Sequence, residues 1–181
     1  MAEPITLLIN RTDITPYAQV AIHAREDAML QPYILAAQNI DVKPVLGAAL
    51  WYDLLTNPYG AFNAVLMEGG SYTDENGNTV TFQGVKAALA CFTYARYMLA
   101  KNAVDTPFGM VAKTSEYSTQ VAPELLVSIA SEKRNEGSAY IRECTRYLDQ
   151  NAAQFPLWEA TGCGKTNSSK FIHRLTPASH F

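Results

Sequence analysis

Residues 83–103 read QGVKAALACFTYARYMLAKNA, and this stretch decides the fold. Its apolar residues occupy almost the whole circumference of a helix, and Lys86 and Arg96 bound its richest apolar run. A helix that is apolar on all sides is normally buried. We therefore predict a long helix at the centre of a mainly helical protein. The apolar run is far shorter than the roughly 20 residues that span a bilayer, so membrane insertion is not expected.

Four further helices are predicted around this centre, at residues 26–40, 48–55, 62–67 and 123 to about 153, because apolar residues recur there at helical spacing. In the first of them one apolar face is expected, comprising Met29, Leu30, Tyr33, Ile34, Ala37 and Ile40. A break is predicted at residues 41–44, which include Pro44. In the last helix, Gly137 is expected to permit the close approach of another helix, although a kink is an alternative.

A β-hairpin is predicted between the third helix and the central one. Two β-prone segments, 71–73 and 79–82, flank residues 74–78, which contain an Asn-Gly pair typical of hairpin turns. Tyr72, Val80 and Phe82 are candidate partner contacts on this hairpin, whose alternative interpretation is a surface loop without a binding role. Residues 105–120 carry turn residues without helical period and are predicted to be a loop.

The composition predicts one domain, residues 1–158, followed by a flexible basic tail, residues 159–181. The segment before Arg25 is predicted to be an extended arm with one short helical turn. The formal charge of −3 divides into −6 for residues 1–159 and +3 for the rest, where Lys165, Lys170 and Arg174 are the only charged side chains. A body this acidic is poorly suited to general nucleic-acid binding, which depends on Lys and Arg.

The low content of charged residues, 17% against the roughly 25% usual for soluble domains, suggests that part of the surface is buried against partners. Three cysteines without a CxxC pair suggest neither a disulfide framework nor a zinc site, and they fit a reducing compartment. The start of the chain carries an acid where a signal peptide needs basic residues, so secretion by the general route is not expected.

No motif in the sequence supports a catalytic, cofactor or metal site. Gly164-Lys165-Thr166 matches the end of a P-loop, but Glu159 stands where the first glycine is required and no buried strand is predicted before it. His23, His173 and His180 lack companion ligands at metal-binding spacing. Glu132 and Glu136 share a helix face within a charged run, which is typical of solvated carboxylates. Cys91 and Cys144 are interpreted as small core residues, whereas Cys163 is a candidate reactive thiol.

Several blocks of the sequence resemble a family of small virion proteins from tailed phages of Bacteroidota, including crAss-like phages. The similar blocks lie between residues 27 and 158 and comprise Gln31-Pro32-Tyr33-Ile34, Asp41 to Gly47, Leu50 to Leu55, Gly69 to Thr73, Phe82 to Lys86, Tyr94 to Tyr97, Asp105 to Gly109 and Phe155 to Trp158. These are packing and turn motifs, and none of them is a catalytic signature.

The resemblance implies a head-to-tail connector, also called a neck, adaptor or head-completion protein, made in the host cytoplasm and located in the virion neck. Such proteins form a ring, commonly twelvefold, beneath the portal protein and against adjacent neck or tail rings. We therefore expect a non-enzymatic structural protein whose partners are copies of itself, the portal and neighbouring rings, without a membrane or a cofactor. The ring it would form and its copy number remain open.

The tail supplies the second set of candidate partner contacts. These residues are Lys165, Lys170, Phe171, Ile172, Arg174, Leu175 and Phe181. Because terminal segments gain partners by folding on binding, we expect the tail to dock on the portal or the next ring. The alternative is a DNA-contacting completion factor whose basic tail holds the packaged genome, and salt-sensitive DNA binding would favour it. A third class, an enzyme that uses the Gly-Lys-Thr segment, would require nucleotide binding that depends on Lys165.

Overall fold

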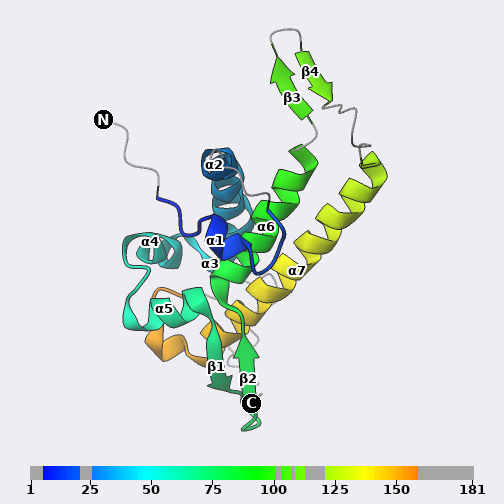
Figure 1. Cartoon of the computed structure of the whole chain (residues 1–181). Coiled ribbons are helices and arrows are strands. Elements are labelled where there is room, and N and C mark those ends of the chain that lie inside the picture. The colour runs from blue at the N-terminus through cyan, green and yellow to red at the C-terminus, as the bar shows by residue number, and fades with distance from the viewer. Residues whose placement is uncertain (1–5, 21–25, 101–102, 107–108, 113–120, 159–181) are drawn as a thin grey trace, which may run out of the picture.

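The structure is a computed structural model, and it describes residues 6–20, 26–100, 103–106, 109–112 and 121–158. It is mainly helical, as predicted, and the predicted hairpin is present (Figure 1). The elements are α1 (Arg11–Ile14), α2 (Glu26–Ala36), the π-helix η1 (Ala37–Val42), α3 (Lys43–Leu46), α4 (Ala48–Thr56), α5 (Ala61–Glu68), β1 (Gly70–Thr73), β2 (Thr79–Phe82), α6 (Gly84–Ala100), β3 (Ala103–Thr106), β4 (Gly109–Ala112), α7 (Pro123–Gln150) and the 3-10 helix η2 (Ala152–Gln154).

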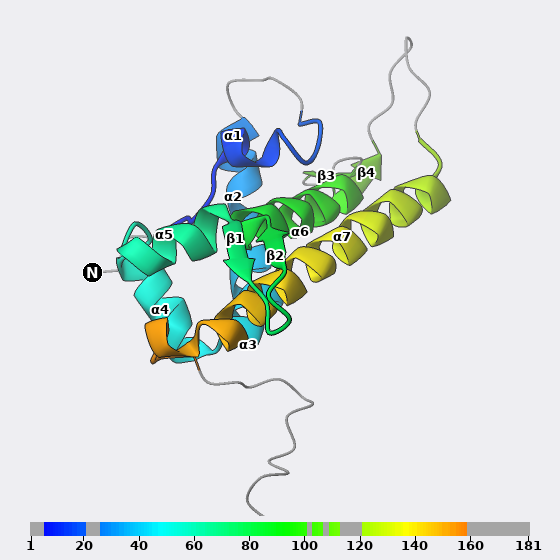
Figure 2. The same cartoon turned by 90° about the horizontal axis from the view of Figure 1, so that it is seen from below.

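Helix α6 is the central helix, as its sequence predicts. Every residue from Val85 to Ala95 except Lys86 and Tyr94 is buried. Figure 1 shows α6 between α2 and α7, and Figures 1 and 2 both show α7 running back along α6. Gly137 lies where the two long helices meet, because a Cβ atom at this position would come within 3.0 Å of the Phe92 ring. The predicted close approach at Gly137 is therefore confirmed.

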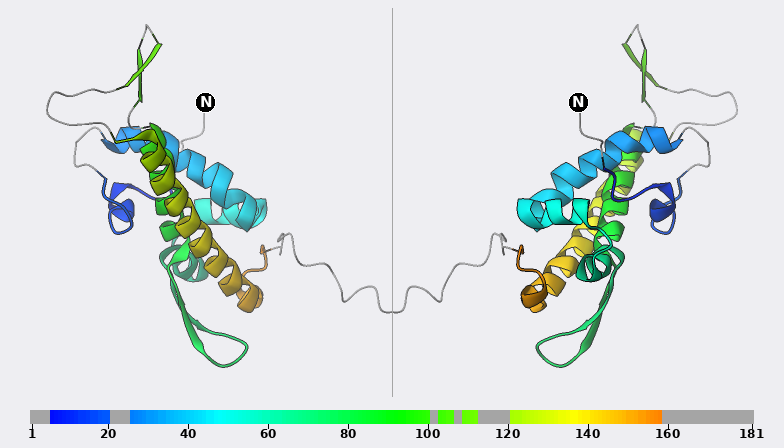
Figure 3. Two further views of the ribbon diagram at one scale, coloured as in Figure 1. Left: turned by 90° about the vertical axis from the view of Figure 1, so that its right-hand side faces the viewer. Right: turned by 90° about the vertical axis from the view of Figure 1, so that its left-hand side faces the viewer.

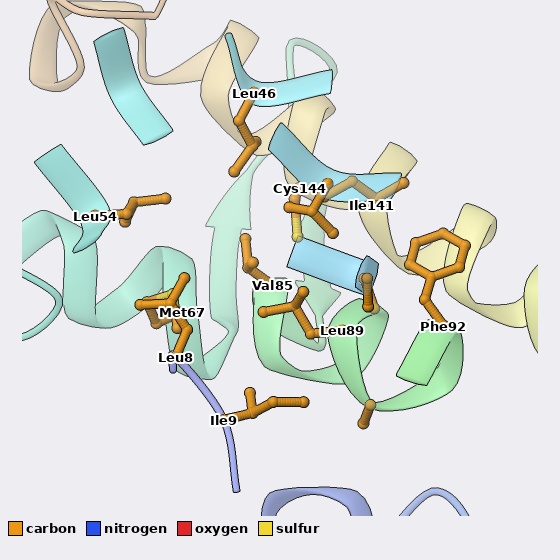
Figure 4. Close-up of a cluster of buried hydrophobic side chains, with 14 of the residues drawn as sticks. Leu8, Ile9, Leu46, Leu54, Met67, Val85, Leu89, Phe92, Ile141 and Cys144 are labelled. Carbon is orange, nitrogen blue, oxygen red and sulfur yellow. The ribbon is translucent and has the colours of Figure 1, made fainter. Parts of the chain in front are cut away.

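The hydrophobic core is built around α6 from elements at both ends of the sequence. Figure 4 shows Leu46 and Leu54 on one side of Val85 and Leu89, and Ile141 and Cys144 of α7 on another. Leu8 and Ile9 complete this cluster from the N-terminal segment. Removing such side chains from water is the main force that stabilises the fold.

The break predicted between the helices at residues 26–40 and 48–55 lies at Gly47 and not at residues 41–44. The helix continues from α2 through η1 and α3 and ends at Gly47, so the expectation of a break at residues 41–44 is wrong. The π turns of η1 are wider than α-helical turns, and the Lys43 amide donates to Gln38 O at their end. Pro44 follows directly, in the first turn of α3. Proline lacks an amide hydrogen but is tolerated in a first turn, so it interrupts this helix without ending it.

The N-terminal segment, expected as an arm, lies against the core in its described part. Leu8 N–H donates to the Gln38 side-chain oxygen at 2.8 Å, and the Gln38 amide donates to Thr6 O at 3.2 Å. Gln38 is itself 2% exposed, so its amide group satisfies backbone that would otherwise be buried unpaired. Further along, Lys133 of α7 donates to Tyr17 O at 3.1 Å. Residues 6–20 are thus tied to both α2–η1 and α7.

The β1–β2 hairpin leaves the helical body between α5 and α6, and Figure 3 shows it projecting from one end. The strands pair antiparallel, with Gly70 opposite Phe82 and Thr73 opposite Thr79. At its base Gly69 and Gly84 have φ of +88° and +76°, and a Cβ on either would lie 2.4 Å from backbone atoms of the other side. Only glycine permits this crossing, because it has no Cβ and populates positive φ freely.

A second hairpin, β3–β4, occupies part of the segment that the sequence assigns to a loop. Ala103 pairs with Ala112 and Thr106 with Gly109, so the strands are four residues long. A strand of four residues shows too few alternations of apolar and polar side chains to be recognised from the sequence pattern. The prediction of a loop is therefore wrong at residues 105–106 and 109–112, and the predicted central helix ends at Ala100 and not at Ala103.

Candidate interaction surfaces

The three hairpin residues expected to contact partners lie on the face that turns toward α7. Phe82 is 3% exposed and stacks on Tyr147 at 4.5 Å between ring centroids, and Tyr72 meets Tyr147 edge-on at 5.6 Å. Val80 is opposite Tyr72 in the register and is half-buried. Phe82 therefore anchors the hairpin to its own subunit, which corrects the expectation that it meets a partner. For Tyr72 and Val80, which keep some exposure, a partner role stays a prediction.

The opposite face of the hairpin is polar. Side chains alternate between the two faces of a strand, so Ser71, Thr73, Thr79 and Thr81 point away from α7, and all four are exposed. At the tip, Asp74 accepts hydrogen bonds from the Asn76 and Asn78 amides at 2.9 and 2.8 Å. These bonds lower the pKa of Asp74 from its ordinary value of 3.8. The hairpin thus offers partners hydroxyl groups and an ordered turn.

A groove lies between the α4–α5 connection and the residues that follow η2. It has a volume of about 260 Å³ and is lined by Leu50, Asp53, Asn57, Gly60, Ala61, Phe62, Asn63, Gln154, Phe155, Pro156 and Leu157. Phe62 and Leu157 are large apolar residues on its rim, at 47% and 44% exposure. The Asn63 amide holds the polar wall together, because it donates to Asp53 Oδ2 at 2.7 Å and to Asn57 O at 3.0 Å.

Two exposed apolar surfaces lie away from the groove. The first, the α2 face, consists of Met29, Pro32 and Ile40 on α2 and η1. Met29 and Ile40 are 51% and 61% exposed, whereas Leu30 and Ile34 are buried, so the expected apolar face is only partly covered by the core. The second group, the α6–α7 end, comprises the exposed apolar side chains Leu99, Val121, Leu125 and Val127. Leu125 and Val127 project from α7 about 200° apart, and Val127 lies among polar side chains that include Glu124 and Glu132.

These two surfaces lie on different sides of the subunit. Helices α2 and α7 each pack against α6, which runs between them in Figure 1. This packing leaves some apolar side chains uncovered. They are those of the α2 face, together with Leu125 and Val127. Large apolar side chains left exposed in this way are candidates for protein–protein contacts.

The titratable side chains near Tyr17 form a structural cluster. The Lys133 ammonium, which binds Tyr17 O, also pairs with Glu136 at 2.7 Å, and the Cys91 thiol lies 3.8 Å from Glu136. Burial raises the pKa of Cys91 to about 12, and burial likewise raises the pKa of Cys144 to about 12. Both cysteines are therefore protonated thiols at neutral pH. A nucleophilic cysteine reacts as the thiolate, so neither is suited to that role. This agrees with their interpretation as core residues.

The other sequence-based expectations about sites concern residues beyond the described part of the chain. Lys165, Lys170, Phe171, Ile172, Arg174, Leu175 and Phe181 lie outside it, as do Cys163 and the three histidines. The last described residues before the Gly-Lys-Thr segment, 152–158, form η2 and a turn, whereas a P-loop follows a strand. Within the described ranges, no three His, Cys, Asp or Glu side chains are placed to share a metal ion. None of the described helices is both long and apolar enough to cross a membrane.

The groove and the two apolar surfaces were missed by the sequence reasoning. A signal for the α2 face was present, because residues 28–40 are apolar around most of the helix although this helix is not the central one. An apolar helix that is covered on one side leaves apolar groups outside. The groove had no comparable signal, since its walls come from segments almost 100 residues apart.

Comparisons with known proteins identify a family without assigning an activity. No curated protein matches the chain, and no solved structure matches it. One family model matches residues 42–168, which extend from the end of η1 through both long helices and into the tail. This range covers most of the chain and includes the β1–β2 hairpin and the groove. The protein belongs to this family of unknown function, DUF6712.

Proposed function

We propose that the protein is a structural virion protein that forms a ring in the phage neck and joins the portal to the tail. The observation that supports it best is the exposure of large apolar side chains in two different places, the α2 face and the α6–α7 end, on helices that lie on different sides of α6. In a closed ring each subunit presents one surface to the neighbour ahead and a different one to the neighbour behind. A subunit with two such surfaces is suited to that assembly.

Composition and resemblance support the same proposal. A charged content of 17% leaves fewer charges to keep subunits apart than the usual surface has. The resemblance to phage connector proteins in residues 27–158 supports a location in the virion neck, and it covers α2, α6 and α7. In this proposal Ile40 of one subunit packs near Val127 of the next, and the hairpin and tail project toward neighbouring rings.

The first test is to mix the purified protein with the portal ring from the same genome and to measure the mass of the complex by light scattering after size exclusion. The proposal predicts a stable complex with about one subunit per portal subunit. A protein that stays monomeric and leaves the portal unchanged contradicts the neck-ring role. Salt-sensitive binding of DNA in its place would favour the completion-factor alternative.

The two surfaces can be tested separately with Ile40→Asp and Val127→Asp. Each variant keeps one good surface, so each alone should fail to form rings, while an equal mixture should form dimers that grow no further. Arg146→Asp is the matched control, because it places the same charge on an exposed position of α7 away from Val127. Rings of normal mass from either variant would show that these surfaces do not join the copies.

A further inference from the structure

The groove between α4–α5 and residues 154–157 has the size and chemistry of a docking site for a single large side chain. Its volume of about 260 Å³ is below the roughly 300–1,000 Å³ of typical small-molecule pockets. Phe62, Phe155 and Leu157 supply apolar walls, and Phe62 and Leu157 leave much of their surface uncovered. An apolar side chain that entered the groove would cover them.

One wall of the groove carries a negative charge. Asp53 Oδ2 accepts from Asn63, and Asp53 forms no ion pair with any other residue in the described ranges. The body of the chain is acidic as a whole, with a net charge of −6 for residues 1–159. A segment that combined a large apolar side chain with basic neighbours would therefore complement the groove better than an acidic or a neutral one.

The chain contains such a segment a short distance beyond the groove. Residues 170–175 read KFIHRL, in which Lys170 and Arg174 flank Phe171 and Ile172. The described chain ends at Trp158, one residue after the groove wall, so residues 159–169 connect the two. Eleven residues can span up to about 36–40 Å, which is ample to return to the groove.

We propose that the groove binds the C-terminal segment 170–175 of its own chain, with Phe171 between Phe62 and Leu157 and the basic side chains toward Asp53. Attachment through a short linker gives the segment an effective concentration in the millimolar range at the groove, which favours its own chain over a second copy. Segment 170–175 contains most of the residues expected to contact the portal. Portal binding by the tail would therefore require this segment to leave the groove.

Site-specific photo-crosslinking in the full-length protein tests this arrangement. p-Benzoylphenylalanine replaces Phe171 in one sample and Phe181 in the control, and each protein is irradiated alone at low concentration. The expected result is an intrachain crosslink from position 171 to residues 50–63 or 154–157, identified by mass spectrometry, and little from position 181. Crosslinks elsewhere, or equal yields from both positions, overturn the proposal. An interchain crosslink overturns the assignment to the same chain.

Two groove variants sharpen the result. Asp53→Lys reverses the charge and should reduce the crosslink yield by up to about fivefold, and Asp53→Asn, which keeps an acceptor for the Asn63 amide, should reduce it less. Circular dichroism melting verifies that both variants fold. A yield unchanged in Asp53→Lys contradicts the charge pairing. This inference does not depend on ring formation, because the crosslink is measured in the isolated subunit and the ring assay uses other residues.

Discussion

The two halves of α7 differ in what they contact. The second half buries Ile141, Cys144, Tyr147 and Leu148 against α6, the hairpin and the residues after η2. The first three turns bury only Leu126 and Ala130, and they leave Leu125 and Val127 exposed. One helix therefore stabilises the subunit at one end and exposes apolar side chains at the other. A residue's apolar character alone does not tell which of these roles it has.

Replacing leucine by alanine at the two ends should separate these roles most strongly. Leu148→Ala removes a fully buried side chain and should lower the free energy of unfolding by about 2–5 kcal/mol. Leu125→Ala, the matched change at an exposed position, should alter it by less than about 0.5 kcal/mol. Chemical denaturation followed by circular dichroism gives both values. Similar losses for the two variants would mean that the first half of α7 also supports the core.

The contact of α7 with α6 can be tested at Gly137, near the middle of α7. A leucine there would be driven into the Phe92 ring and should destabilise the protein by about 1–3 kcal/mol. Gly137→Ala should cost less, since alanine gains about 1 kcal/mol of helix propensity over glycine while its methyl group presses on the same ring. Thermal melting of both variants compares them. If leucine is tolerated as well as alanine, the helices are not in tight contact at this point.

The N-terminal segment contacts α7 near the middle of that helix, through Tyr17 and Lys133, and Gln38 holds the start of the described segment. Gln38→Ala leaves the Leu8 amide without its acceptor and should cost about 1–3 kcal/mol. The local prediction is faster hydrogen exchange at Leu8 with little change at Leu148, measured by NMR. Asn39→Ala, at the exposed neighbouring position, is the control. Unchanged exchange at Leu8 would show that the segment is held by its apolar contacts instead.

Sequence periodicity predicted the elements of this protein better than its surfaces. Helices α4, α5, α6 and α7 and the β1–β2 hairpin were located to within a few residues, because each has a regular pattern bounded by glycine, proline or asparagine. The break placed at Pro44 was wrong, since a proline early in α3 is accommodated after a π turn. The β3–β4 strands were missed because four residues are too few for a pattern.

Surface residues were harder because a pattern shows which side chains share a face and not what covers that face. The alternation in 79–82 correctly groups Val80 with Phe82, yet only the fold reveals that Tyr147 lies against them. In the same way the spacing groups Met29 and Ile40 with the core residues of α2, whereas the structure leaves them exposed. Contacts between segments distant in sequence decide these cases, and local patterns do not contain them.

The smallest effect on stability is expected at the hairpin tip. There the Gln150 side-chain amide, in the second half of α7, donates a hydrogen bond to Glu75 Oε1 at 3.1 Å. Hydrogen bonds from Asn78 and Asn76 lower the pKa of Asp74, so ionised Asp74 stabilises the folded turn. This contribution is present above the unfolded-state pKa near 3.8, and it is lost as the pH falls through the lower folded value. NMR shifts of the Asn76 and Asn78 amides should follow that titration.

Asp74→Ala removes the acceptor of both amides and should abolish this local pH dependence, while the Phe82–Tyr147 contact should keep the base of the hairpin in place. Because Asp74 lies at the hairpin tip, outside the core, the melting temperature at neutral pH should change little. If the variant instead releases Phe82 from Tyr147, measured as lost contacts between the two rings, the turn and the aromatic anchor form one cooperative unit. The whole hairpin, including its tip, would then fold cooperatively with the second half of α7.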